Sequence, residues 1–167
     1  MRREALERVS NFKDKIVEIR DTTKKACASL VDESIDLAYI DGDHTLRGIT
    51  IDLVSILPKI KRGGFIGGDD FTKTIWQHGT SYDPTEVFPF AIYFAEAHDL
   101  TIYTLPFHQF LIVNDAKGFD VKDYAGYTQL TPRQIYVPPK IGFARRMFRI
   151  LPANARGRLK AILHLNR

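Results

Sequence analysis

The sequence predicts an α/β fold in which the main strands run parallel. Three features of Ser34–Phe71 support this: an apolar run ends in an Asp-rich turn, a helical pattern follows, and a second apolar run ends in paired aspartates. A strand, a helix and a second strand in this order form a right-handed crossover, which makes the two strands parallel. Open α/β sheets bind ligands at the carboxyl ends of their strands, so both acidic turns should lie at a binding edge.

Three short elements are expected before this unit. Residues 2–12 have the spacing of the end of a helix, and Lys15–Arg20 reads as a short strand. Thr22–Leu30 reads as a helix, with Asp21 or Thr22 as its N-cap.

The crossover unit itself predicts two strands and one helix. The continuous apolar run of Ile35–Asp41 predicts a strand buried on both faces. Leu46–Ile60 predicts a helix with apolar residues at core spacing, which the pair Gly63-Gly64 is expected to end. Phe65–Asp69 is then the second strand.

The rest of the chain contains weaker patterns. They predict, in order, a loop over 71–84, a helix over Thr85–His98, an antiparallel strand pair over Thr101–Leu105 and Gln109–Val113, and an irregular stretch over 114–139. Two basic amphipathic segments follow, Ile141–Leu151 and Ala155–Leu165, separated by Pro152.

Composition and charge divide the chain into a body and a tail. A length of 167 residues suits one domain. The tail from Lys140 holds eight of the 24 Lys and Arg and no acidic residue, which leaves 16 basic and 20 acidic residues in 1–139. We therefore expect a domain over 1–139 and a basic helical tail over 140–167. The single cysteine and the lack of a signal-peptide pattern favour a cytoplasmic protein.

The tail has three interpretations. Basic amphipathic segments can lie on an anionic membrane surface, so 141–165 could contact the inner face of a membrane peripherally. The alternatives are a solvated tail and a contact with a partner protein or nucleic acid, of which nucleic acid is the least expected. The oligomeric state is not predicted.

Three carboxylates are expected to converge at the edge where the two strands end. Asp41 follows the first strand, and Asp69 and Asp70 follow the second. Carboxylate oxygens are preferred by Mg²⁺ and other hard divalent cations, so these three residues are candidate metal ligands. The alternative is that each of them caps a local turn. Asp43 is read as a capping residue first and as a ligand second.

The motifs I-D-L-A-Y-I-D-G-D-H at 35–44 and G-G-F-I-G-G-D-D at 63–70 resemble class I S-adenosylmethionine-dependent methyltransferases. The resemblance covers roughly residues 12–114. It is strongest to the metal-dependent O-methyltransferase branch, which includes catechol, caffeoyl-coenzyme A, cephalosporin and macrolide enzymes. It implies a Rossmann-like sheet that ends in an antiparallel pair. It also implies S-adenosylmethionine as methyl donor, a metal on Asp41, Asp69 and Asp70, and the hydroxyl of a small molecule or saccharide as acceptor.

The resemblance also gives roles to residues outside this triad. It implies that His44 is the general base and that Asp21 and Thr22 bind the adenine ring. His44 could instead cap the helix that follows it or bond the backbone, and Asp21 and Thr22 could be no more than a helix start. Trp76, His78 and Tyr82 in the loop after the acidic pair are candidates to line a substrate pocket.

One departure from the family limits what this chain can do alone. The glycine-rich loop that follows the first strand of the family, and the acidic end of the second strand, have no counterpart here, since no G-x-G pattern precedes residue 42. The sheet is thus expected to be partial, without the first two strands of the family, and the chain to be a fragment of a longer protein. Two rival hypotheses are a non-catalytic remnant or binding module that keeps the scaffold without the cofactor, and a Mg²⁺-dependent hydrolase.

Overall fold

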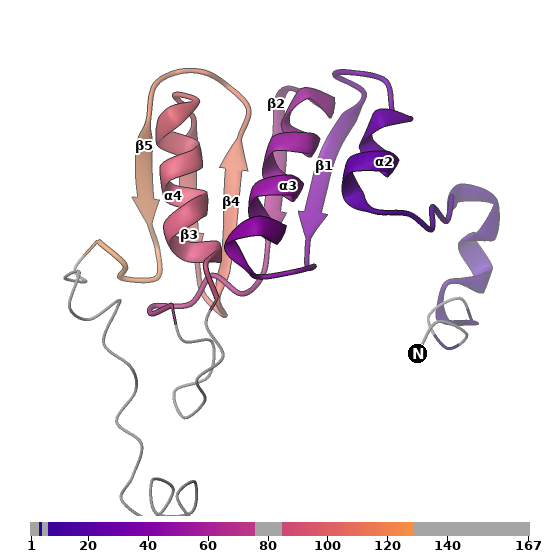
Figure 1. The fold of residues 1–167 in the computed structure, drawn as a ribbon, viewed down its shortest axis with the longest axis horizontal. Coiled ribbons are helices and arrows are strands. Elements are labelled where there is room, and N and C mark those ends of the chain that lie inside the picture. The colour runs from indigo at the N-terminus through magenta and orange to yellow at the C-terminus, as the bar shows by residue number, and fades with distance from the viewer. Residues whose placement is uncertain (1–3, 5–6, 76–84, 129–167) are drawn as a thin grey trace, which may run out of the picture.

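The computed structural model describes residue 4 and residues 7–75 and 85–128, which form a five-stranded sheet with helices packed against it (Figure 1). The strand order is β1 (Ile35–Ile40), β2 (Ile60–Gly68), β4 (Gln109–Val113), β3 (Thr101–Leu105) and β5 (Asp120–Asp123). The β1–β2 and β3–β5 pairs are parallel, and β4 is antiparallel to β2 and to β3. The predicted α/β class and the antiparallel pair near the end are confirmed, and the architecture is that of a partial Rossmann-like sheet.

In the described part of the chain three α-helices accompany the sheet, one before the first strand and two between strands. They are α2 (Thr23–Ala28), α3 (Leu46–Ile56) and α4 (Val87–Ala97), and two short 3₁₀ helices are present, η1 (Ser10–Lys15) and η2 (Leu57–Lys59). The Thr45 hydroxyl caps α3 by accepting a hydrogen bond from Gly48 N at 3.1 Å. Ile49, Leu53 and Ile56 then face the core, as their spacing predicts.

The predicted strand over Lys15–Arg20 is wrong. Lys15 ends η1, and residues 16–20 are exposed and have no regular structure. A strand needs a neighbour for its backbone groups, and no described strand lies beside this segment. Its β-branched residues alone do not form a strand.

Gly63-Gly64 do not end a helix, which corrects a second prediction. Regular α-helix ends at Ile56, Pro58 lies in η2, and both glycines lie inside β2. Gly63 has φ +76° and its N–H donates to Asn114 O at 2.7 Å. A Cβ on Gly64 would lie 2.9 Å from Asp36 O, so the close approach of β1 and β2 requires glycine there.

Strand β5 was not predicted, because 114–139 reads as irregular. Its four residues, Asp-Val-Lys-Asp, have little apolar content, and pairing with β3 in register from Thr101↔Asp120 makes them a strand. Such a short charged strand is typical of a sheet edge.

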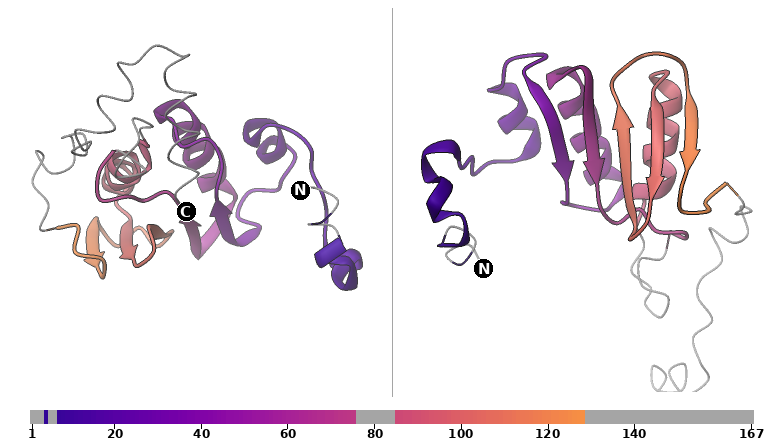
Figure 2. Two further views of the ribbon diagram at one scale, coloured as in Figure 1. Left: turned by 90° about the horizontal axis from the view of Figure 1, so that it is seen from below. Right: turned by 180° about the vertical axis from the view of Figure 1, so that it is seen from behind.

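The two faces of the sheet differ in burial. On one face Ile66, Ile102 and Ile112 are fully buried beneath α3 and α4. On the other face Leu37 is 59% exposed and Phe65 is 39% exposed. Figure 2 shows that α3 and α4, which are labelled in Figure 1, lie on a single side of the strands. The prediction that Ile35–Asp41 is buried on both faces is therefore wrong for the described residues, because only one layer of helices covers them.

An aromatic cluster fixes the segment that follows β2. The ring centroid of Phe71 lies 5.1 Å from that of Phe88 and 5.0 Å from that of Tyr127. The Tyr127 hydroxyl donates a hydrogen bond to Phe71 O. Burial, together with the nearby charge of Asp123, raises the pKa of Tyr127 well above its usual value. Because Phe71 directly follows Asp70, this cluster holds the end of β2 in place.

Within the described ranges, no helix is long and apolar enough to cross a membrane.

Candidate functional site

The ends of β1 and β2 bring the predicted carboxylates to one edge of the sheet. Ile40 pairs with Gly68, and Asp69 N donates to Ile40 O at 3.1 Å, so Asp41 and Asp69 follow directly on neighbouring strands. A small hollow, which we call the acidic notch, is lined by Asp41, Asp43, His44, Asp69, Asp70 and Val87. Its volume is about 10 Å³, which leaves room for one water-sized group. The geometric prediction of a common acidic edge is confirmed.

Two of these carboxylates are engaged with nearby backbone. Asp43 Oδ1 accepts from Thr45 N at 3.0 Å, and this hydrogen bond lowers the pKa of Asp43. Asp69 Oδ1 accepts from Asp70 N at 2.8 Å. The capping interpretation thus holds for Asp43, and Asp69 also uses one oxygen locally.

The loop 42–45 is held against the start of α4, and this fixes His44. Its carbonyl accepts from Glu86 N at 2.9 Å, and its Nδ1 lies 3.8 Å from Asp70 Oδ2. Both side chains are partly buried. The alternative in which His44 caps α3 is wrong, because Thr45 is the N-cap. A partly buried imidazole beside a carboxylate is an arrangement suited to accepting a proton.

A larger groove is also lined by Asp41. We call it the β1 groove; it measures about 240 Å³ and is lined by Thr23, Tyr39, Asp41, Gly42, Asp52 and Ile56, among others. It shares Ile40, Asp41 and Gly42 with the acidic notch. The two hollows, which differ in size, therefore adjoin each other at this short segment.

The residues predicted to bind adenine lie beside this groove. Thr22 is the N-cap of α2 and makes no side-chain capping bond, and Asp21 Oδ1 accepts from Thr22 N at 2.8 Å. Asp21 Oδ1 also lies 3.6 Å from Lys25 Nζ. Thr23, the next residue along the chain, lines the groove. The adenine-binding role of Asp21 and Thr22 stays a prediction.

Tyr39 and Asp52 also line the groove, and sequence reasoning missed both. The Tyr39 hydroxyl accepts from Gln109 Nε2 at 3.1 Å. Burial raises the pKa of Tyr39, and the charges of Asp69 and Asp41 add to that rise. Asp52 is a buried acid on the core-facing side of α3. The sequence contains one indication for each residue. Tyr39 is two positions before Asp41, so both side chains should lie on the same face of the strand. Asp52 is a charged residue among the apolar residues that face the core from its helix.

The described side chains do not form a metal site as they stand. Within residues 4, 7–75 and 85–128, no group of three His, Cys, Asp or Glu side chains is arranged to hold a metal ion. The local hydrogen bond of Asp69 turns one of its oxygens toward backbone rather than toward the notch. Metal binding by Asp41, Asp69 and Asp70 therefore stays a prediction. The candidate pocket residues Trp76, His78 and Tyr82 lie outside the described residues.

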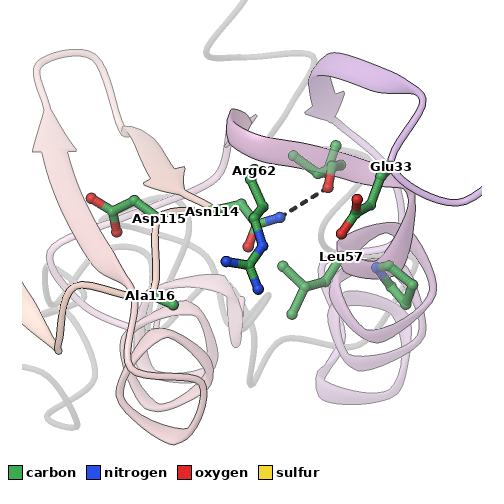
Figure 3. Close-up of a pocket in the computed structure, with 8 residues that line it drawn as sticks. Glu33, Leu57, Arg62, Asn114, Asp115 and Ala116 are labelled. Carbon is green, nitrogen blue, oxygen red and sulfur yellow. Dashed lines mark hydrogen bonds between the residues drawn. The ribbon is translucent and has the colours of Figure 1, made fainter.

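A hollow of about 290 Å³ lies at the opposite end of the sheet, where Glu33, Leu57, Arg62 and Asn114 meet (Figure 3). Oxygen Oδ1 of Asp115 is buried there and makes no hydrogen bond within the described part of the chain. In Figure 3 the Asp115 carboxylate points away from Arg62 and Glu33. This hollow adjoins the amino ends of β1 and β2, a strand length away from Asp41, so it is not part of the same site.

Comparison with known proteins gives one family match, which covers the amino-terminal part of the chain. A family model described as a methyltransferase domain matches residues 2–71, a range that includes Asp41, His44, Asp69 and Asp70. The match supports a methyltransferase domain, and such a domain implies S-adenosylmethionine as methyl donor. A search of curated proteins finds no match.

Proposed function

We propose that this chain supplies the carboxyl-terminal part of an S-adenosylmethionine-dependent O-methyltransferase domain that acts on a hydroxyl of a small molecule or saccharide. The observation that carries the proposal is the pair of hollows that share Asp41 and Gly42. The β1 groove is large enough for part of a nucleoside, and the acidic notch accepts one oxygen-sized group. Because the two hollows share these lining residues, a donor in the groove and a hydroxyl in the notch would lie next to each other.

His44 is the proposed base. S-adenosylmethionine, when bound, supplies a methyl group on a positively charged sulfur. The acceptor oxygen forms a bond to that methyl carbon, the carbon–sulfur bond breaks, and S-adenosylhomocysteine leaves with the bonding electron pair. The hydroxyl proton passes to the His44 imidazole, and the carboxylate of Asp70, 3.8 Å from Nδ1, stabilises the imidazolium that results.

Metal assistance is a separate part of the proposal, and the methyl transfer to the acceptor oxygen does not depend on it. Its support is that three carboxylates line one notch. Ionised carboxylates this close repel one another, and a divalent cation would relieve that repulsion. Methyl transfer measured before and after treatment with EDTA, with Mg²⁺ added back, tests this part alone.

The proposed setting is cytoplasmic, with peripheral contact between residues 141–165 and the inner face of a membrane. The support is the sequence alone: the tail carries eight basic residues and no acidic one. The rival is a binding module that keeps the scaffold without using the cofactor. Cofactor binding separates this rival from the enzyme.

Asp41→Asn is expected to weaken the binding of S-adenosylhomocysteine about tenfold, because it removes a charged hydrogen-bond acceptor from the wall of the β1 groove. Isothermal titration of the protein measures this. Asp36→Asn is the matched control: Asp36 lies on the same strand, is exposed and pairs with Lys61 at 2.7 Å. A correctly folded protein that does not bind S-adenosylhomocysteine would favour the binding module. Equal affinities of the original protein and both variants would show that Asp41 does not contribute to cofactor binding.

His44→Gln is expected to lower the rate of methyl transfer by about 10²–10⁴-fold and to leave the affinity for S-adenosylhomocysteine unchanged. Transfer of a radiolabelled methyl group to a panel of catechols, phenolic acids and monosaccharides measures the rate. His98→Gln, an exposed histidine at the end of α4, serves as the control. A His44 variant as active as the His98 variant contradicts the assignment of the base.

A further inference from the structure

A third hollow opens on the same edge of the sheet as the acidic notch, at the ends of β3 and β5. We call it the aromatic cavity; its volume is about 280 Å³ and its lining includes Lys73, Leu105, Phe107, His108, Tyr124 and Tyr127. Strands β3 and β5 are parallel to each other, and Figure 1 shows the arrows of β1 and β5 pointing to the same end of the sheet. The cavity and the notch therefore face the same side of the molecule.

The cavity lies close to the notch. Phe71 directly follows Asp70, and Phe71 N donates to His108 O at 2.8 Å. The ends of β2 and β3 are two strand spacings apart across β4, which corresponds to about 10 Å. A molecule of one ring with a short side chain can span that distance.

The charge of the cavity is opposite to that of the notch. Its lining holds the ammonium of Lys73 and the imidazole of His108, and none of its lining residues is acidic. Lys73 Nζ lies 5.9 Å from the ring centroid of Tyr127 and forms no ion pair with any described carboxylate. The neighbouring Asp123 directs its oxygens to the groups of its own loop and to Thr104. Lys73 is thus available to an anion from outside.

The cavity also presents aromatic rings. Phe107 is 89% exposed, and Tyr124 is 68% exposed and stacks on Tyr103 with ring centroids 6.3 Å apart. Phe107 and His108 have φ values of +62° and +61°, a backbone conformation that bulky residues rarely adopt. Turns of this kind ordinarily use Gly, Asn or Asp. A strained turn that holds a large ring in water is typical of a surface built for a ligand.

We propose that the aromatic cavity binds the methyl acceptor, and that this acceptor is a ring-bearing anion whose acidic group contacts Lys73 and whose ring packs on Phe107 and Tyr124. Only the identification of the bound molecule as the methyl acceptor rests on the proposed function. Its binding to the cavity can be measured without cofactor. The acceptor hydroxyl would then lie at the notch, about two strand spacings from the cavity.

A charge series of small probes tests the proposal. The probes 4-hydroxyphenylacetate, 4-ethylphenol and tyramine share one ring and carry a negative, a neutral and a positive side chain. Ligand-observed NMR on the intact protein should rank them in that order. Phenyl phosphate and glucuronate are then compared with 4-hydroxyphenylacetate, which distinguishes a phosphate from a carboxylate and a saccharide from an aromatic ring.

Variants locate the site. Lys73→Gln should weaken anion binding about tenfold and remove the preference over tyramine, whereas Lys117→Gln, an exposed lysine at the other end of the sheet, should change neither. Phe107→Ser should weaken the binding of all three phenols. S-adenosylhomocysteine affinity should be unchanged in every variant, so a failure here is distinct from a failure of the cofactor site. Equal binding of anion and cation, no binding of any anion at millimolar concentration, or a Lys73 variant that binds like the original protein overturns the proposal.

Discussion

Asp123 is the residue with the strongest local network in the described structure. Burial opposes its charge, but hydrogen bonds from Thr104 and from the backbone and side chain of Thr128 outweigh this and lower the pKa of Asp123 far below its usual value. Backbone N–H groups of Ala125 and Gly126 add donors at 3.1 and 2.8 Å. One carboxylate therefore holds the loop that carries Tyr124 and Tyr127.

Asp123→Asn is expected to lower the free energy of unfolding by about 1–3 kcal/mol at neutral pH. Because the folded-state pKa is depressed, the stabilisation is present above the unfolded value of about 3.9 and is lost as the pH falls below it. Urea unfolding from pH 7 to pH 3 should show the difference between the two proteins shrinking. Asp32→Asn, an exposed carboxylate, is the control; a difference that is constant with pH contradicts the assignment.

At the residue scale the sequence predicts position better than orientation. The convergence of Asp41, Asp69 and Asp70 follows from strand order alone, so it could be predicted. The direction of each carboxylate depends on local backbone donors, such as Asp70 N for Asp69, and these appear only with the fold. Tyr39 could not be placed from the sequence because its hydroxyl bonds Gln109, which is distant in the chain. Asp52 could not be placed either, because the groove that it lines forms only when α3 packs beside β1.

At the scale of the elements, the two errors in strand prediction share one cause. Residues 16–20 have strand-forming side chains and no neighbour, whereas β5 has poor strand formers and a neighbour in β3. Pairing is a long-range property, so local propensity failed in both directions. The crossover from β1 through α3 to β2 was predicted correctly because its apolar periodicity is strong and its contacts are near in sequence.

The unequal faces of the sheet give a prediction for its strands. Ile66→Ala should lower the free energy of unfolding by about 2–5 kcal/mol, because Ile66 is fully buried and a cavity would remain. Leu37→Ala on the neighbouring strand should cost less than about 1 kcal/mol, because that side chain is 59% exposed. Urea unfolding measures both. Similar losses would mean that the outer face of β1 is covered in solution.

At the scale of the whole molecule, charge is separated between body and tail. The body is mildly acidic and the tail is basic. Each Lys or Arg side chain near an anionic surface should contribute about 1 kcal/mol to the free energy of membrane binding. Binding to vesicles should therefore depend on lipid charge and on salt.

Replacing Arg145, Arg146 and Arg149 together by Gln should weaken binding to phosphatidylglycerol vesicles about 100-fold, the equivalent of about 3 kcal/mol. Sedimentation with vesicles measures this, with phosphatidylcholine vesicles as the neutral reference. Replacing Lys13, Lys24 and Lys25 by Gln removes the same charge from the body and should have little effect. Equal binding to both lipids, or an equal loss in both variants, contradicts membrane contact by the tail.

The border that the β1 groove and the acidic notch share at Asp41 and Gly42 has a consequence for the order of events in catalysis. In the proposed function the donor in the β1 groove and the hydroxyl in the acidic notch are bound at the same time, so neither substrate has to depart before the other arrives. Turnover through such a site passes through a ternary complex and needs no methylated form of the protein. Initial-rate plots against one substrate at several fixed levels of the other would then intersect rather than run parallel.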